Sequence, residues 1–220
     1  MRGEPQRSGH RMQAATESDD LDPSQCALLV LDCQPEALRS VENSRALMFR
    51  TNSAIEMMRR LCGHVAFTRL AFEDCDYRFT PSTNKEFTAL AAERRLRNGT
   101  SGAELHPGLA VTPSDIVVRK TRLGAFSTTN LDEMLTNLGV TTLILAGIHA
   151  SGAVLSTVRE AADRDYRLIV LADCISDTDM ATKQMLMEQV FPRQARVLTS
   201  SRLERALTSH ISAGHVTAVI

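Results

Sequence analysis

Two charged residues stand directly after apolar runs that have the character of buried strands. Asp32 follows the run CALLVL at 26–31, and Lys120 follows the run DIVVR at 115–119. A carboxylate in such a place is costly to desolvate unless it is paired or protonated. An aspartate and a lysine that meet at one sheet edge can hold a proton ready for transfer. A helix-capping aspartate and a solvated lysine are the alternative, and position alone favours neither.

The elements that must bring these two residues together alternate along the chain. Apolar runs predict six strands, at 26–31, 64–69, 115–119, 142–146, 168–172 and 195–198. Helical spacing predicts helices at 44–61, 84–96, 131–138, 153–165 and 181–190. Continuously apolar strands that alternate with helices indicate an α/β fold, with a parallel sheet covered on both faces. Such sheets bind ligands beyond the carboxyl ends of their strands, where Asp32 and Lys120 both lie.

The composition limits the classes of function. The chain has 220 residues, of which 43% are hydrophobic, so we expect a single domain at 23–220 after a disordered polar tail at 1–22. The formal net charge is −1, which gives no support to a nucleic-acid or membrane-surface partner. No stretch has the length of a membrane span or the character of a signal peptide, so a cytoplasmic location is expected.

The cysteines do not form a recognisable site. Five of them occur, an odd number with irregular spacing and without the pattern of zinc ligands. We therefore expect reduced and mostly buried thiols, no metal and no cofactor.

Three separated segments carry a resemblance to a known family. They are LLVLDCQ, VVRKTRLGAFSTTNLDEML at 117–135, and LILAGIHASGAVLSTVREAADRDYRLIVLADC at 143–174. These resemble the isochorismatase-like, or cysteine, hydrolases. The resemblance implies a three-layer α/β/α sandwich around a six-stranded parallel sheet, with a catalytic Asp32 and Lys120. Many relatives also bind a metal through Asp and His after the second strand, but RLAFEDCDYRF has no histidine, so no metal site is carried over.

The resemblance also places a nucleophilic cysteine where this chain has Ala153, at the end of GIHASGA. A methyl group cannot attack a carbonyl, so three hypotheses remain open. The first is hydrolysis of the vinyl ether of isochorismate to pyruvate and a dihydroxy-dihydrobenzoate, which needs an acid but no thiol. The second is a nicotinamidase-like amidase whose cysteine has been replaced. The third is a relative that binds its ligand without turnover.

The ether reaction assigns a role to each group. Asp32 must carry the proton that it donates to the substrate, and Lys120 is expected to bind a substrate carboxylate. The amides of Gly152 and Ala153, at a helix start, are expected to bind a second anionic group. In a plant pathogen this activity would divert isochorismate from salicylate synthesis, and signal-less secretion would then replace the cytoplasmic location.

The remaining candidates are expected to line the pocket of a small anionic substrate. Their positions follow the predicted strands or the Ala153 loop, and several match the resemblance. A role in turns, core packing or surface ion pairs is the alternative for each. The substrate-binding candidates are Gln34, Arg69, Arg122, Phe126, Ile148, His149 and Gly152. We also expect a homodimer or higher homo-oligomer, formed through the helix after Ala153 or the methionine-rich helix at 181–190.

Overall fold

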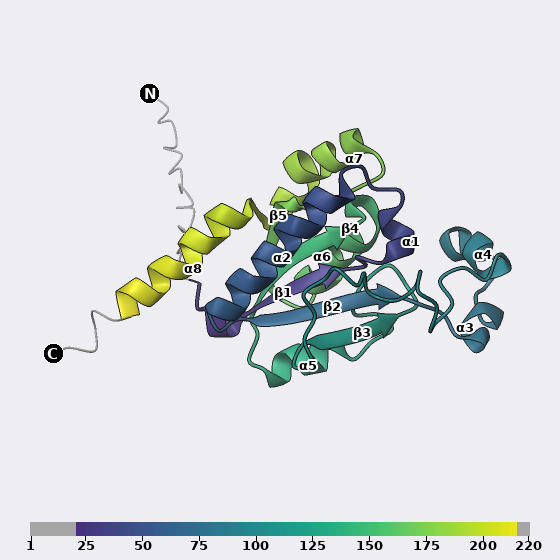
Figure 1. Cartoon of the computed structure of the whole chain (residues 1–220), viewed down its shortest axis with the longest axis horizontal. Helices are drawn as coiled ribbons and strands as arrows, with labels where there is room; N and C mark the ends of the chain where they lie inside the picture. The colour runs from purple at the N-terminus through teal and green to yellow at the C-terminus, as the bar shows by residue number, and fades with distance from the viewer. Residues whose placement is uncertain (1–20, 215–220) are drawn as a thin grey trace, which may run out of the picture.

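A parallel sheet forms the centre of the molecule in the computed structural model, which describes residues 21–214 (Figure 1). The sheet has six strands in the order β3-β2-β1-β4-β5-β6. Their bounds are β1 Cys26–Leu31, β2 His64–Leu70, β3 Ile116–Lys120, β4 Thr142–Ile148, β5 Arg167–Ser176 and β6 Arg196–Leu198. All five pairings are parallel, which confirms the predicted fold class.

Helices connect the strands and cover the sheet. The longer α-helices are α2 Ser44–Arg60, α4 Lys85–Ala92, α5 Leu131–Asn137, α6 Leu155–Ala162 and α8 Ser200–Gly214. The shorter ones are α1 Pro35–Leu38, α3 Asp74–Arg78 and α7 Met180–Met185. Four short helical turns complete the set. Two have 3-10 geometry, η1 Pro23–Gln25 and η4 Phe191–Arg193. The other two have π geometry, η2 Ala150–Val154 and η3 Leu186–Val190.

Two hydrophobic cores lie on opposite faces of the sheet because side chains alternate along a strand. In β1, Leu28 and Val30 belong to the core that α2 and α8 cover. Their neighbours Leu29 and Leu31 belong to the core that α5 and α6 cover. Every residue of β1 is buried, so this strand has no solvent-facing side, as its continuous apolar run predicts.

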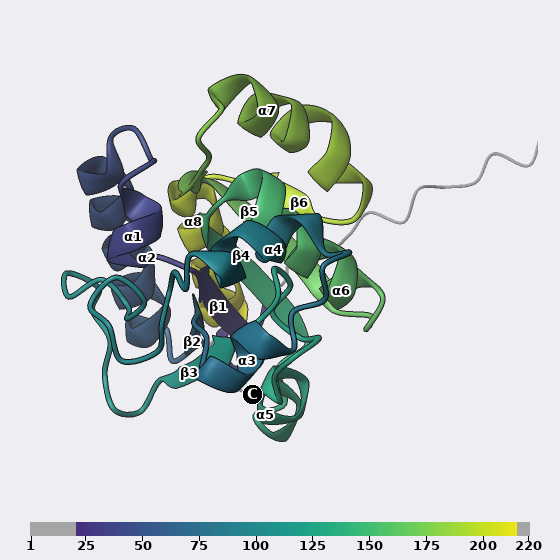
Figure 2. The ribbon, with the colours of Figure 1, turned by 90° about the vertical axis from the view of Figure 1, so that its right-hand side faces the viewer.

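The excursion between β2 and β3 lies beyond the carboxyl ends of these strands. Figure 1 places α3 and α4 at that end, and Figure 2, which looks toward it, shows them in front of the sheet. A third, smaller core holds this region together, with Phe72 stacked on Tyr77 and close to Phe87. The excursion therefore covers the edge where the sequence places its candidate site.

Some boundaries differ from the prediction. Strands β4 and β5 run on to Ile148 and Ser176, because they resume pairing there after a register shift. The helix expected at 153–165 begins earlier as the π turn η2 and ends at Ala162. The helix α8 was not predicted, since only Leu203 and Leu207 of its described side chains are fully buried.

The beginning of the described chain also differs from the expected boundary. Leu21 is buried in the core, and the Asp22 side chain accepts a hydrogen bond from the Ser24 amide at the start of η1. Both residues were assigned to the polar tail. The other residues of the expected tail, 1–20, lie outside the described part of the chain. Within the described chain, no helix is both long enough and apolar enough to cross a membrane.

Gly147 allows β1 and β4 to approach each other next to Asp32. It has φ +117°, and a Cβ atom there would lie 2.1 Å from the Leu31 carbonyl oxygen. Because Leu31 is also its register partner, neither strand can move away without breaking the ladder. Only glycine satisfies both conditions.

We predict that Gly147→Ala will lower the free energy of unfolding by roughly 3 kcal/mol or more, from backbone strain and the clash together. Gly139→Ala is the matched control, because Gly139 also has positive φ but nothing lies within 4 Å of its added Cβ. That control should lose only about 1–2 kcal/mol. Urea unfolding measures both, and equal losses would contradict the steric argument.

Candidate active site

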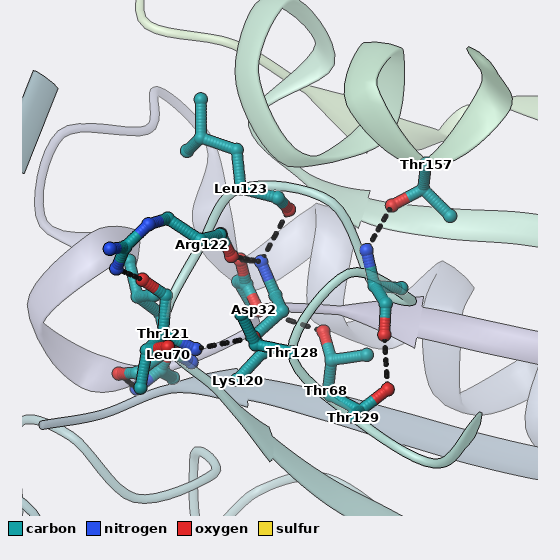
Figure 3. A network of polar contacts seen from close by, with 12 residues as sticks. Asp32, Thr68, Leu70, Lys120, Thr121, Arg122, Leu123, Thr128, Thr129 and Thr157 are labelled. Atoms are coloured by element: carbon teal, nitrogen blue, oxygen red, sulfur yellow. Dashed lines mark hydrogen bonds and ion pairs between the residues drawn. The ribbon is translucent and has the colours of Figure 1, made fainter. Parts of the chain in front are cut away.

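Asp32 stands at the carboxyl end of β1, where the chain leaves the sheet in a left-handed turn with φ 51°. Aspartate tolerates this conformation better than most residues. The turn is held by the Asp32 amide, which donates to the Thr68 carbonyl at 3.2 Å. The Thr68 hydroxyl in turn donates to Asp32 Oδ1 at 2.7 Å (Figure 3). Strand β2 thus fixes both the backbone and the carboxyl group of Asp32.

Lys120 ends β3 and reaches across β2 to the same carboxyl group. Its Nζ lies 2.7 Å from Asp32 Oδ2, and its side chain is completely buried. The same Nζ donates to the carbonyls of Leu123 at 2.6 Å and Arg122 at 3.2 Å (Figure 3). A lysine ammonium has three N–H groups, and these three acceptors account for all of them.

The contacts of this pair satisfy the polar groups of both side chains. Asp32 receives a hydroxyl on one oxygen and the Lys120 amino group on the other, so each oxygen has a partner. One expectation is corrected. Lys120 is not available to a substrate carboxylate, because its three N–H groups have partners and its side chain has no exposed surface. That Asp32 donates a proton to a substrate stays a prediction.

A cavity of about 860 Å³ opens beside the pair. Asp32 lines it directly, whereas Lys120 lies behind Asp32 and does not. The sheet edge, α1, α4 and the η2 turn all contribute to its walls. Six of the residues predicted from the sequence line it, namely Asp32, Gln34, Ile148, His149, Gly152 and Ala153.

Gln34 holds the cavity wall through its own hydrogen bonds. Its Nε2 donates to the carbonyls of Leu70 at 2.9 Å and Ala103 at 2.7 Å. Its Oε1 accepts from the Leu70 amide at 2.8 Å. These contacts link β1, β2 and the excursion, so the side chain positions the wall more than it recognises a substrate.

Three predicted substrate-binding residues lie away from the cavity because they have other partners. Arg69 contacts Asn98 and Glu104. The Arg122 guanidinium lies over the Phe87 ring, with 5.4 Å between its Cζ and the ring centroid. Phe126 is buried in the sheet core and stacks on Tyr166. Strand-end position alone does not say which way a side chain points.

The turn η2 places Ala153 in the cavity wall with 3% of its surface exposed. The chain enters this turn through a cis peptide bond between Ile148 and His149. The Gly152 amide was expected to bind an anionic group. It donates instead to the His149 carbonyl at 3.2 Å and is therefore not available to a ligand. The amide of Ala153 remains the backbone candidate for an anion.

Asp177 lines the cavity and is buried, although it is not among the residues predicted from the sequence. Its Oδ2 accepts from both the amide and the hydroxyl of Ser151, each at 2.7 Å. Burial alone would raise the pKa of Asp177, but the hydrogen bonds from Ser151 and the Asp179 amide, together with the charge of His149, lower it below its ordinary value. The apolar run predicts that β5 ends before Asp173. The strand instead continues to Ser176, so Asp177 is the acid that follows its last residue.

Two arginines and two glutamates also line the cavity without having been predicted. Arg95 Nε donates to Glu36 Oε1 at 2.8 Å, which makes them an ion pair in the wall. Arg39 and Glu86 are exposed lining residues. Arg39 and Arg95, in place of Arg69 and Arg122, are thus the arginines that line the cavity.

No thiol is available to replace the absent nucleophile. All five cysteines lie in the described part of the chain, and none lines the cavity. Burial raises the pKa of Cys33 and Cys174 to about 12 and that of Cys26 to about 11, so these thiols are neutral at neutral pH. Cys62 and Cys75 are exposed away from the site. Within residues 21–214, no group of histidine, cysteine and acidic side chains could hold a metal.

Comparisons with known proteins identify the family. The sequence profile of the isochorismatase domain matches residues 26–202. The isochorismatase family protein YwoC of Bacillus subtilis is 26% identical over 181 residues, which cover 82% of this chain and 93% of YwoC. The isochorismatase of Bacillus subtilis is 27% identical over 84% of this chain, a match that spans 59% of that enzyme.

Two further comparisons concern a different activity and the fold. The ureidoacrylate amidohydrolase RutB of Methylorubrum extorquens is 42% identical over 81 residues, which cover 37% of this chain and 33% of RutB. The structure of an isochorismatase family protein from Burkholderia thailandensis superposes with a TM-score of 0.76 and 26% identity. That match covers 86% of this chain and 97% of the other. The named relatives thus include both an isochorismatase and an amidohydrolase.

We predict that Lys120→Met will lower the free energy of unfolding by roughly 3–5 kcal/mol, because it leaves the Asp32 charge buried without a cation. The double variant Asp32→Asn/Lys120→Met should lose less than the sum of the two single changes. Lys85→Met, at an exposed lysine, is the control and should change stability by less than about 0.5 kcal/mol. Additive losses in urea unfolding would show that the two charges do not interact.

We predict that the stabilising effect of Asp177 depends on pH. Because its pKa is lowered by folding, its contribution is fully present above the ordinary value of 3.8 and is lost as the pH falls through the lower folded-state value. The difference in unfolding free energy between the wild type and Asp177→Asn should therefore shrink below pH 3.8. Urea unfolding from about pH 7 to about pH 3 measures it. A difference that stays constant over this range would contradict the assignment.

Proposed function

The chain belongs to the isochorismatase family of hydrolases, and on that premise we propose that it hydrolyses the vinyl ether of isochorismate to pyruvate and a dihydroxy-dihydrobenzoate. One observation carries the proposal. The cavity is lined by one half of a buried proton-holding pair and by no thiol. An enol ether is cleaved through protonation at carbon, so a positioned proton is sufficient for this reaction.

The proton begins on Lys120 and reaches the substrate through Asp32. Transfer across the 2.7 Å between Nζ and Oδ2 converts the ion pair into a neutral acid and a neutral amine. The total charge does not change, so the buried site bears no new desolvation cost. Asp32 then protonates the enolpyruvyl methylene carbon, which gives an oxocarbenium ion and leaves the carboxylate beside it.

Water completes the reaction and restores the pair. It adds to the oxocarbenium carbon, and the hemiketal that forms collapses to pyruvate and the ring alcohol. The proton that water loses returns to the Asp32 carboxylate, and from there to Lys120. In this sequence the Asp32 carboxylate also stabilises the developing cation through its charge.

Two arginines line the cavity, of which Arg39 is exposed and Arg95 is paired with Glu36. We expect Arg39 and the backbone of the η2 turn around Ala153 to bind the carboxylates of this substrate. Guanidinium groups bind carboxylates with two parallel hydrogen bonds, which fixes the orientation of the substrate. Removal of isochorismate in this way would also divert it from salicylate synthesis wherever the two meet.

Amide hydrolysis is the second candidate function, which the partial match to RutB supports. That chemistry requires a covalent acyl-enzyme at position 153, where this chain has alanine. Amide hydrolysis therefore requires that a thiol first be introduced at position 153.

We predict pyruvate release from isochorismate by the wild type, followed through a coupled lactate dehydrogenase assay. Asp32→Asn should lower kcat/KM by about 100-fold or more, because it removes the proton donor. Asp163→Asn, an exposed aspartate outside the cavity, is the matched control. Absence of pyruvate at enzyme concentrations where a known isochorismatase is fast would overturn the proposal. In the same experiment, carboxamide hydrolysis gained by Ala153→Cys would favour the amidase instead.

A further inference from the structure

A second polar cluster lines the cavity, and the Asp32–Lys120 pair does not use it. Its members are Ser40, after α1, His149, after β4, and Asp177, after β5. The Ser40 Oγ lies 3.1 Å from His149 Nε2. The cluster runs from a buried carboxylate through a half-buried imidazole to an exposed hydroxyl. This order of exposure is the one that a hydroxyl nucleophile requires, because the base is shielded while the nucleophile meets the substrate.

Asp177 supplies a fixed negative charge to the cluster. The amide and hydroxyl of Ser151 hold its carboxylate at 2.7 Å each, and the Asp179 amide lies 3.3 Å from its other oxygen. His149 and Asp177 also interact electrostatically, since the charge of His149 helps to lower the pKa of Asp177. Asp177 therefore brings a carboxylate that is ionised at neutral pH to the same cavity as His149.

The Ser40 hydroxyl has one proton and two polar neighbours, of which His149 Nε2 accepts only in the tautomer that carries its proton on Nδ1. The Ala37 carbonyl lies 2.9 Å from Oγ, and His149 Nε2 lies at 3.1 Å. When the hydroxyl turns toward Nε2, the imidazole can take its proton as the oxygen attacks a carbonyl. The backbone of Ser40 is anchored by its amide, which donates to the same Ala37 carbonyl at 3.3 Å.

We propose that Ser40 is a nucleophile toward small esters in this cavity, with His149 as its general base and Asp177 as the carboxylate that stabilises the imidazolium. The Ser40 Oγ forms a bond to the ester carbonyl carbon, and its proton passes to His149 Nε2. The bond between that carbon and the alcohol oxygen then breaks, and His149 gives the proton to the departing alcohol. Water attacks the acyl-serine through the same base, which releases the acid and restores the hydroxyl.

This activity differs from the ether reaction in both residues and chemistry. It uses a covalent acyl-serine, whereas the ether reaction uses proton transfer to carbon. It also places a nucleophile in a family site that lacks its thiol, on a different wall of the cavity from Ala153. Arg39 precedes Ser40 in the chain and lines the same cavity, so esters that carry a carboxylate are the substrates that its charge favours.

A fluorophosphonate probe tests the assignment on the full-length chain. Intact mass measurement should show one added phosphonyl group, and peptide mapping should place it on Ser40. Ser40→Ala should abolish the modification, and His149→Gln should lower its rate by about 100-fold, the size of a lost general base. Ser53→Ala is the matched control, since Ser53 is an exposed serine on α2 outside the cavity, and it should be modified at the wild-type rate.

Hydrolysis of p-nitrophenyl acetate gives the second readout. Ser40→Ala and His149→Gln should both reduce it to the background rate, and Ser53→Ala should not. Circular dichroism of each variant separates loss of the nucleophile from loss of the fold. Modification at another residue, or an equal rate in Ser40→Ala and the wild type, would overturn the proposal. Pyruvate formation is not part of this readout, so its outcome is independent of the ether reaction.

Discussion

The buried contact between Asp32 and Lys120 constrains the whole carboxyl edge of the sheet. A completely buried ammonium is tolerable only when every N–H has an acceptor, and Lys120 finds them in Asp32 and two carbonyls of the loop that follows β3. This requires β3 to keep its register with β2, so that Lys120 lies beside Leu70. It also requires the loop to turn back within three residues. The register of β3 with β2 and the turn of this loop together fix the position of the cavity wall.

The same constraint explains why the sequence predicts the centre of the site better than its periphery. Asp32 and Lys120 interrupt apolar runs, and a buried charge must be paired, so their types and positions together indicate a partner. Arg69 and Arg122 also follow strands, but a partly buried guanidinium can have many different partners, and theirs are Asn98, Glu104 and the Phe87 ring. That choice depends on the excursion, whose polar sequence has little periodicity to read.

Asp177 shows a second limit of sequence analysis. The apolar run of β5 ends at Ala172, yet the strand continues to Ser176 because β4 pairs with it again after a register shift. A shift of this kind leaves no hydrophobic pattern. The acid that directly follows the apolar run, Asp173, caps α8 instead, by accepting from the amide and hydroxyl of Ser200. Pairing between strands, which the fold alone decides, therefore determined which aspartate reaches the cavity.

The two proposed chemistries follow from a difference in solvent access across one cavity. At the buried end, Asp32 and Lys120 hold a proton between two nearly inaccessible side chains, and the proposed ether reaction transfers it to carbon. At the exposed end, Ser40 and His149 meet the solvent that acyl transfer consumes in its second step. A thiol at position 153 would line the same cavity and would add a third reactive group to it. Ala153 supplies no such group, so the two proposed reactions depend only on the side chains at the two ends of the cavity.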